Sequence, residues 1–272
     1  MRRIVVKLGT NVIMRADGKV ALGLLCGLVE QVAALRDQGY EVLVVSSGAV
    51  GLGVERLGLS ARPTVLAQVQ ACAAIGQSRL MAFYGDAFDR LNCPIAQVLL
   101  TEDDFRDPTR HANLRATLDA LLTMGVIPIV NENDTVSTME LERPSDGAPQ
   151  RERIFGDNDK LSALLVKHIG GDLLVLLSDV DGLYDRNPNE PGATLLPRVD
   201  AIDDSVLQMA QGSLSARGRG GMTSKLESAN IALRAGKQVV IANGRTPQVL
   251  ERIMAGEEVG TRFAKPVAAG SW

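Results

Sequence analysis

Aromatic and histidine residues are scarce in this sequence, and their scarcity excludes several kinds of site. Aromatic residues make up 3% of the chain, and the only histidines are His111 and His168. So few side chains of these types argue against a base-stacking nucleic-acid surface, a histidine-based catalytic triad or a zinc centre. The formal net charge is −3, which gives no electrostatic reason to expect a nucleic-acid partner.

Cysteines and long apolar runs are scarce as well. Cys26, Cys72 and Cys93 are widely spaced in apolar surroundings, which is typical of free thiols in a reducing compartment rather than of disulfides or a metal site. No apolar run reaches the roughly 18 residues of a membrane span. The N-terminus enters a strand pattern almost at once, without a signal-peptide pattern. We therefore expect a cytoplasmic protein with no membrane association and no protein-held metal.

Short β-branched runs alternate with segments of helical periodicity along the whole chain. Such runs are typical of parallel strands that are buried on both faces of a sheet. Helical segments between them favour an α/β fold. The predicted strands cover residues 4–6, 42–45, 95–100, 126–130, 173–177 and 238–242. The intervening segments are predicted helices, one of them over residues 63–92 with a break near Gly76.

The first predicted strand runs into a lysine and a glycine turn, within the stretch IVVKLGTNV from Ile4 to Val12. A charged ammonium at the end of a buried strand is unfavourable unless an anion meets it there. Gly9 would let the backbone approach that anion closely. The pattern therefore favours phosphate binding by Lys7. The alternative is that Lys7 extends to the surface beside an ordinary turn.

Polar or small residues follow two further predicted strands. The segment SSGAVG at 46–51 either presents backbone N–H groups to a ligand or forms a plain strand–helix turn with serine as the N-cap. The segment NENDT at 131–135 places five polar residues in a row at the carboxyl end of a strand. Open α/β sheets bind ligands at that edge, so we favour a site over a solvated turn.

Three later segments have the same character. GDNDK at 156–160 opens a helix with two carboxylates, where a simple N-cap needs one. SDVDGLY at 178–184 could hold a nucleotide or only form its own turn. GRGGMTSK at 218–225 has three glycines, with Thr223 as the expected helix cap and Lys225 in the first turn. A bound phosphate would offset the unfavourable position of that lysine near the positive end of the helix dipole.

Together these segments suit phosphoryl transfer. Lys7 and Lys225 each lie in a glycine-containing loop, and acidic and amide residues lie at strand ends between them. Phosphoryl transfer needs a protein that positions two substrates and stabilises the charge on the moving group. If the acceptor is a carboxylate, it is already ionised near neutral pH and needs no general base. The scarcity of histidine then presents no obstacle.

Six motifs, in this order along the chain, resemble those of the glutamate 5-kinase family: VKLGTN at 6–11, SSGAVGLG at 46–53, NENDTV at 131–136, GDND at 156–159, SDVDGLY at 178–184 and GGMTSK at 220–225. The resemblance implies the amino acid kinase fold, a three-layer α/β/α sandwich around a mainly parallel sheet of about eight strands. It also implies that residues 1–272 form a single domain, with the glutamate site mainly in its N-terminal part and the ATP site mainly in its C-terminal part.

The resemblance further implies the reaction of ATP with L-glutamate to give ADP and L-glutamyl 5-phosphate, the first step of proline biosynthesis. ATP and Mg²⁺ would take part, with the ion held mostly by phosphates and water. Feedback inhibition by proline and assembly into dimers or tetramers are common in the family. Two alternatives stay open: a sister kinase acting on N-acetylglutamate, aspartate or carbamate, and a non-catalytic nucleotide or amino-acid sensor of the same fold.

The family's functional residues can be carried onto matching positions of this sequence. The implied catalytic residues are Lys7, Lys225 and Asp159, the last of which would orient the two lysines. Glutamate would contact Ser47, Gly48, Asp134, Asp157 and Asn158. The backbone amides of Gly9-Thr10 and Ser47-Gly48 would also face the phosphates. ATP would contact Lys7, Gly9, Thr10, Ser178, Asp179, Arg219, Gly220, Gly221, Met222, Thr223, Ser224 and Lys225.

The sequence departs from the family pattern at three places. Arg219 stands where many relatives have threonine, and Thr223-Ser224 replaces a common Ser-Thr pair. The segment 138–153, predicted to be an exposed hairpin or flap, is longer than we expect in relatives. Many bacterial members continue past a tryptophan into a small PUA domain, whereas this sequence stops at Trp272, so that domain is expected to be absent.

Overall fold

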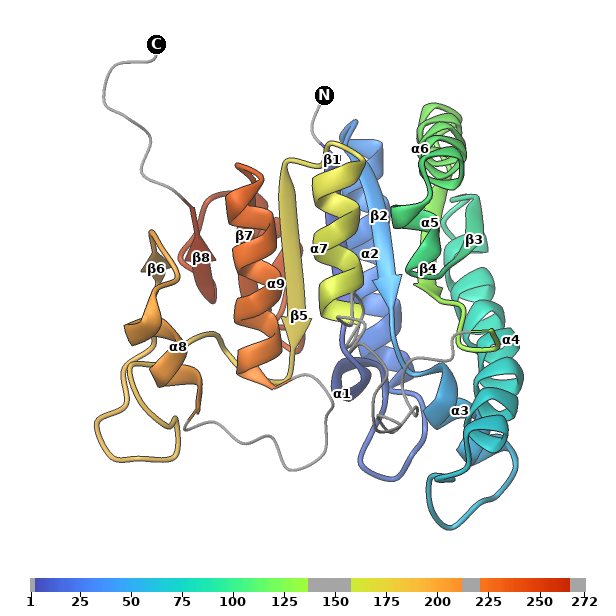
Figure 1. Ribbon diagram of the computed structural model, residues 1–272, viewed down its shortest axis with the longest axis horizontal. Coiled ribbons are helices and arrows are strands. Elements are labelled where there is room, and N and C mark those ends of the chain that lie inside the picture. Colours follow the sequence, from blue (N-terminus) through green and yellow to red (C-terminus); the bar gives the residue numbers. More distant parts are fainter. Residues whose placement is uncertain (1–2, 137–157, 212–220, 265–272) are drawn as a thin grey trace, which may run out of the picture.

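A computed structural model describes residues 3–136, 158–211 and 221–264 of the chain. Its centre is an eight-stranded sheet in the order β3-β4-β2-β1-β5-β7-β8-β6 (Figure 1). The strands are β1 Arg3–Leu8, β2 Glu41–Ser46, β3 Ile95–Leu100, β4 Ile127–Glu132, β5 Leu173–Ser178, β6 Arg198–Val199, β7 Gln238–Asn243 and β8 Thr261–Phe263. All neighbouring strands pair in parallel except β7 and β8, which are antiparallel.

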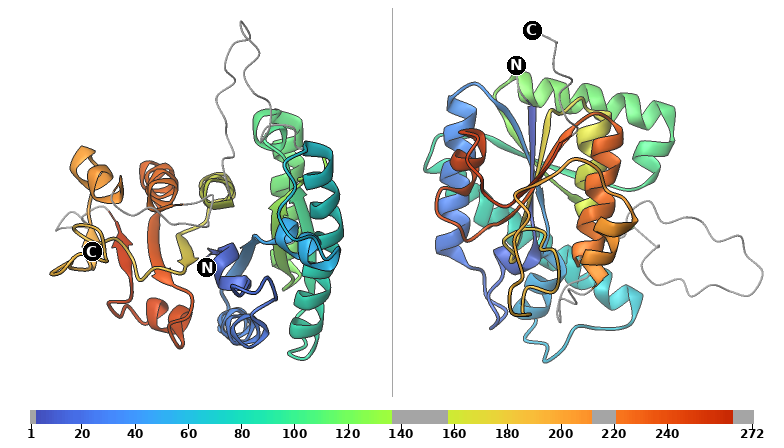
Figure 2. Two further views of the ribbon diagram at one scale, coloured as in Figure 1. Left: turned by 90° about the horizontal axis from the view of Figure 1, so that it is seen from below. Right: turned by 90° about the vertical axis from the view of Figure 1, so that its left-hand side faces the viewer.

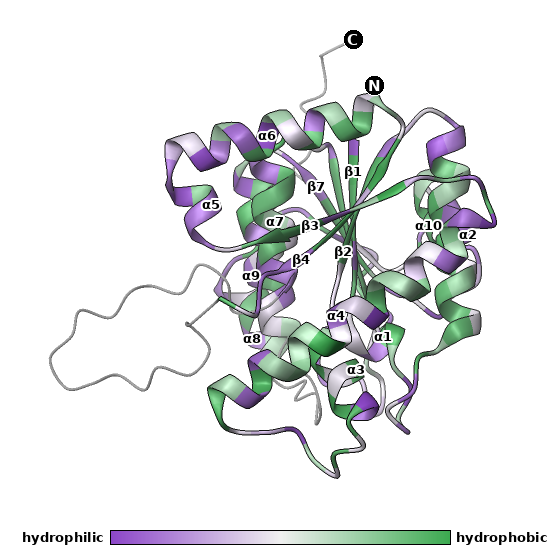
Figure 3. Cartoon of the chain, turned by 90° about the vertical axis from the view of Figure 1, so that its right-hand side faces the viewer, coloured by the Kyte–Doolittle hydropathy of each residue, from purple (hydrophilic) through white to green (hydrophobic). Residues whose placement is uncertain are grey.

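Helices cover both faces of this sheet (Figure 2). They are α1 Thr10–Ile13, α2 Leu22–Asp37, α3 Ala49–Arg56, α4 Leu66–Asp89, α5 Asp103–Arg106, α6 Pro108–Thr123, α7 Asn158–His168, α8 Asp204–Gln211, α9 Met222–Arg234 and α10 Val249–Met254. Figure 3 shows hydrophobic strands at the centre, with α2 and α10 on one side and α7 and α9 on the other. The predicted α/β/α sandwich around a mainly parallel sheet is confirmed.

Strand β1 shows how the two faces are filled. Ile4, Val6 and Leu8 pack with residues of α2, α4 and α10 on one face of the sheet, whereas Val5 packs with α6, α7 and α9 on the other. Successive side chains of a strand point to opposite faces, so a β-branched run buries every residue in one of two cores. Because β1 lies between β2 and β5, its carboxyl end and the loop after it come to the middle of the sheet's edge.

The predicted break near Gly76 is wrong, because α4 continues from Leu66 to Asp89. A Cβ atom on Gly76 would lie 1.7 Å from the Ala49 carbonyl oxygen, and one on Gly53 would lie 1.9 Å from the Cys72 carbonyl oxygen. Helices α3 and α4 therefore approach each other at positions where only glycine fits. The glycine serves close helix packing and does not end the helix.

Other sequence predictions concern the start of α9, the short elements and the segment 138–153. Helix α9 begins at Met222 with Gly221 as its N-cap, so the expected cap at Thr223 is wrong. The short elements α8, β6 and β8 were not predicted; β6, for example, has 2 residues. The expected flap at 138–153 lies outside the described residues. None of the helices in the described part of the chain has the length and apolar character needed to cross a membrane.

Candidate active site

One buried carboxylate joins two lysines from opposite ends of the chain. Lys7 comes from β1, Asp159 from the first turn of α7 and Lys225 from the first turn of α9. The Lys7 Nζ lies 2.6 Å from Asp159 Oδ1, and the Lys225 Nζ lies 3.3 Å from Asp159 Oδ2. Asp159 is fully buried, and the two lysines are 6% and 5% exposed. The structure thus brings together the three residues that the sequence analysis assigned to catalysis.

The charges of this cluster favour an anion. Burial alone would raise the pKa of Asp159, but the Lys7 and Lys225 ammonium groups lower it below its ordinary value. Asp159 is therefore ionised at neutral pH, and the three groups together carry one net positive charge, from two ammonium groups and one carboxylate. Such a charge in a buried place is stabilised by an incoming anion. A phosphate or a phosphoryl group in transfer is an anion of this kind.

A group of three amides lies next to this cluster, because Asn158 immediately precedes Asp159. Asn131 and Gln77 are buried and Asn158 is half-buried. The Asn158 Nδ2 lies 2.9 Å from the Ser46 carbonyl oxygen, the Ser47 Oγ and the Asn131 Oδ1. The Asn131 Nδ2 in turn donates to the Gln77 Oε1 at 2.8 Å. The chain of hydrogen bonds therefore brings together Ser47 and Asn158, both predicted to bind the acceptor.

Two of these amides were not assigned a role from the sequence. Asn131 stands within the NENDT segment, so its signal was present, and the structure places it near the end of β4. Gln77 lies inside α4, in no recognisable motif.

Two other predicted acceptor contacts lie just beyond the ends of strands. Gly48 follows Ser47 as the N-cap of α3, with φ at 101°. Asp134, two residues beyond β4, is partly buried.

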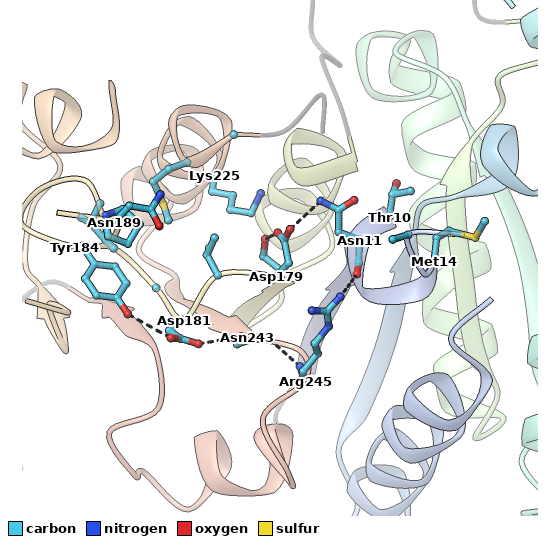
Figure 4. Close-up of a pocket in the computed structure, with 18 of the residues that line it drawn as sticks. Thr10, Asn11, Met14, Asp179, Asp181, Tyr184, Asn189, Lys225, Asn243 and Arg245 are labelled. Carbon is cyan, nitrogen blue, oxygen red and sulfur yellow. Dashed lines mark hydrogen bonds between the residues drawn. The ribbon is translucent and has the colours of Figure 1, made fainter. Parts of the chain in front are cut away.

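A cavity of about 1020 Å³ opens on the other side of Lys225 (Figure 4). This size lies at the upper end of the range for small-molecule and cofactor sites. Six residues predicted to contact ATP line it: Thr10, Ser178, Asp179, Gly221, Met222 and Lys225. The described lining does not include Lys7, Gly9, Thr223 or Ser224, although the last two lie in the first turn of α9.

Side-chain hydrogen bonds connect the cavity wall across three segments, which follow β1, β5 and β7 (Figure 4). The Asn11 Nδ2 donates to Asp179 Oδ2 at 2.9 Å, and the Arg245 Nη2 donates to the Asn11 carbonyl at 3.3 Å. Asp181 accepts from Asn243 Nδ2 at 2.9 Å and from the Tyr184 hydroxyl at 3.2 Å. Burial, and then the charge of Asp181, raise the pKa of Tyr184.

Asn11, Asn243 and Arg245 were not predicted as site residues. Asn243 ends β7 and pairs with Ser178 of β5, so both stand at the same edge of the sheet. The rule that parallel strands carry ligands at their carboxyl ends could therefore have identified it. Arg245 follows two residues later. Asn11 stands within the VKLGTN motif but was not singled out.

Two backbone amides expected to face phosphate have other partners. The Gly9 N–H donates to the Leu177 carbonyl at 3.1 Å, and the Ser47 N–H donates to the Leu8 carbonyl at 3.3 Å. These bonds join the loops after β1 and β2 to the neighbouring strands, so both amides stabilise the edge of the sheet. Asp157, Arg219 and Gly220 lie outside the described residues. The described part holds no cluster of three or more histidine, cysteine or acidic residues that could hold a metal ion.

Comparisons with known proteins identify the family of this chain. Residues 2–243 match the model of the amino acid kinase family. The chain is 49% identical to the glutamate 5-kinase of Gloeobacter violaceus, over 97% of this chain and 69% of that protein. It is 43% identical to the glutamate 5-kinase of Lactiplantibacillus plantarum, over 96% of each chain.

Solved structures with the same fold are more distant in sequence. A carbamate kinase from Giardia matches with a TM-score of 0.66 at 16% identity, over 97% of this chain and 99% of that one. The UMP kinase of Bacillus anthracis matches with a TM-score of 0.62 at 16% identity, over 98% and 97% of the two chains. At this identity the likeness concerns the fold alone. From the family match and the close relatives, the chain belongs to the amino acid kinase family and, within it, to the glutamate 5-kinases.

Proposed function

We propose that this chain transfers the γ-phosphoryl group of ATP to the side-chain carboxylate of L-glutamate, giving ADP and L-glutamyl 5-phosphate. This is the first step of proline biosynthesis. The observation that carries the proposal is the cluster of Lys7, Asp159 and Lys225, which adjoins a nucleotide-sized cavity through Lys225 and the group of three amides through Asp159. The glutamate 5-kinases at 43–49% identity support the choice of acceptor.

In this reaction a carboxylate oxygen of glutamate attacks the γ-phosphorus while the bond from that phosphorus to the bridging oxygen of ADP breaks. Lys7 and Lys225 stabilise the charge on the moving group, and Asp159 holds both ammonium groups in place. ATP occupies the cavity, and glutamate lies near Ser47, Gly48, Asp134, Asp157 and Asn158. The acceptor is already ionised, so no protein base is needed.

Magnesium fits this scheme as a partner of the nucleotide. The ion prefers phosphate oxygens and water, with few protein ligands. We assign no side chain to the ion. Its chemistry would be to neutralise charge on the phosphates.

The assay for this proposal measures ADP release from Mg-ATP with L-glutamate, N-acetyl-L-glutamate or L-aspartate, and traps any acyl phosphate with hydroxylamine. We expect ADP and hydroxamate with L-glutamate alone. Activity with another acid would show that the acceptor is not L-glutamate, while the type of reaction would remain as proposed. No turnover with any of them, while ATP still binds, would favour a sensor. An Asp159→Asn preparation controls for contaminating kinases.

Further properties follow from the family resemblance. We propose that residues 1–272 form one domain, that the protein acts in the cytoplasm as a dimer or tetramer, and that proline inhibits it. Sedimentation of the purified chain tests the assembly. Adding L-proline to the glutamate assay tests the inhibition, and unchanged rates at millimolar proline would contradict it.

A further inference from the structure

The orientation of the amides beside the active site is fixed by backbone groups. The Asn158 nitrogen faces the Ser46 carbonyl oxygen, which can only accept a hydrogen bond, so that side-chain atom must be the donor. The Glu132 N–H, which can only donate, lies 2.9 Å from the Asn131 Oδ1. Backbone partners therefore assign the oxygen and nitrogen of each asparagine side chain independently. The hydrogen bond from Asn158 Nδ2 to Asn131 Oδ1 is consistent with both assignments.

The direction of Gln77 follows from theirs. With its oxygen facing Glu132 and Asn158, Asn131 turns its nitrogen to Gln77, so the atom that Gln77 turns to Asn131 is its oxygen. The Gln77 nitrogen is left over at one end of the chain of amides, and the Asn158 oxygen at the other. Both atoms are buried and have no hydrogen-bond partner among the described residues.

These two leftover atoms have opposite character. Gln77 is 9% exposed, and its amide nitrogen offers two N–H donors, whereas the Asn158 oxygen is an acceptor. An unsatisfied buried polar group is costly, so such atoms mark the position of a partner that the site is built to receive. The α-carboxylate of an amino acid accepts hydrogen bonds, so it is the kind of partner that the Gln77 donors lack.

We propose that Gln77 is a specificity-determining residue, whose Nε2 donates to the α-carboxylate of the acceptor amino acid. This inference rests on the proposed function and names a contact beyond it. The side-chain carboxylate must lie near Lys7 and Lys225, where the phosphoryl group is transferred. Gln77 contacts Asn131 of β4, and β2 separates β4 from β1 in the sheet.

The spacing suits a substrate with two carboxylates. Neighbouring strands lie about 4.8 Å apart, so β4 lies roughly 10 Å from β1. Glutamate carries its carboxylates at opposite ends, so its α-carboxylate can reach toward β4 while the other end meets the lysines. Gly76, beside Gln77, lets α4 approach α3 closely, which holds the amide at this position.

The variant Gln77→Glu tests the contact with little change in shape. Its carboxylate can still accept from Asn131, but it replaces the two donors with a negative charge. Loss of a hydrogen bond to a charged group, together with repulsion, should lower kcat/KM for L-glutamate by at least about 30-fold, mainly through KM. The KM for ATP should stay within about twofold of its original value, since Gln77 is not among the residues that line the nucleotide cavity.

A second substrate separates recognition from general damage. L-isoglutamine, the α-amide of glutamate, keeps the side-chain carboxylate but offers an N–H donor where glutamate has the α-carboxylate. The carboxylate that Gln77→Glu introduces would accept from that amide, so the preference for L-glutamate over L-isoglutamine should shrink by at least about tenfold. An equal loss with both substrates, or no loss with either, would overturn the proposal and leave Gln77 as a structural amide.

Gln68→Glu is the matched control, because it makes the same change on the exposed face of the same helix. It should leave both kcat/KM values unchanged. If Gln77→Glu does not fold, as judged by its thermal transition, Gln77→Met keeps the volume without the charge and should also raise the KM for L-glutamate. Should the unaltered protein fail to phosphorylate L-glutamate, the proposed function fails, which is distinct from a failure at Gln77.

Discussion

The two sides of the lysine cluster are built differently. On the acceptor side, Asn131 and Gln77 are 2% and 9% exposed. A backbone group fixes the direction of the Asn131 amide, and Asn131 in turn fixes that of Gln77. On the nucleotide side, the bonds from Asn11 to Asp179 and from Tyr184 to Asp181 join side chains that remain in contact with solvent. A buried bond is costly to break, whereas an exposed one is easily replaced by water. We infer that the first side sets specificity and that the second tolerates change.

Removing the charge of the Asp159 carboxylate, which lies between the two sides, should have the largest effect on turnover and stability. Asp159→Asn leaves two buried ammonium groups without their carboxylate, so we expect turnover to fall by about 10³-fold. The free energy of unfolding should fall by about 3 kcal/mol or more, since breaking a buried ion pair leaves a charge uncompensated. Steady-state kinetics and urea denaturation measure the two losses. Asp86→Asn, an exposed position on α4, is the control and should change neither. Unaltered turnover would remove Asp159 from the mechanism.

Lys225→Ala should have the next largest effect, and it acts mainly on the transition state. Lys225 contacts Asp159 and also lines the proposed ATP cavity. Its ammonium would therefore lie beside the phosphoryl group during transfer from ATP to the acceptor. We expect kcat to fall by about 10²-fold, as for the loss of a transition-state contact. Lys237→Ala, just beyond the other end of the same helix, should keep normal kcat. A kcat for Lys225→Ala close to that of the control would contradict the assignment.

Much of the fold was predictable from local patterns. Buried strands such as Leu173–Ser178 were visible as β-branched or apolar runs, and Gly39 and Gly125 adopt the positive φ expected after a helix. Short elements such as β6 were missed because 2 residues carry no periodic signal. The break at Gly76 was wrong because a sequence does not reveal which helix packs against which glycine.

The site was predictable to a different degree. Lys7 and Lys225 stood out because a lysine in a glycine-containing loop at the end of a buried strand or the start of a helix needs an explanation. The role of Asp159 came from the family resemblance. The convergence of the two lysines on one carboxylate depends on the order of strands in the sheet, which local pattern does not give. Gln77 was missed for the same reason, since an amide inside a helix acquires meaning only from its partner Asn131.

A matched pair of asparagine variants tests the contrast between the two sides directly. Asn131→Ala leaves Gln77 and Asn158 without a buried partner, so we expect a loss of about 2 kcal/mol in the free energy of unfolding, with a raised KM for L-glutamate. Asn11→Ala removes an exposed bond to Asp179, and should raise the KM for ATP by about two- to fivefold, with stability nearly unchanged. Urea denaturation and the two KM values give the comparison. Equal stability losses would show that burial does not separate the two sides.

The smallest effect is expected at the far end of α7, where His168 packs edge-on against His111 and Phe105, with ring centroids 4.9 and 5.7 Å away. Burial lowers the pKa of His168, and the charges of Lys167 and His111 lower it further. The unfolded chain therefore binds a proton at a higher pH than the folded one, so stability should fall as the pH drops below about 6.5. His168→Gln should make the decline between about pH 7.5 and pH 5.5 shallower. Urea denaturation at both pH values measures the slope, and kcat at the higher pH should stay normal, because His168 lies at the opposite end of α7 from Asp159. Parallel stability curves for the two proteins would mean that His168 titrates alike in the folded and unfolded states.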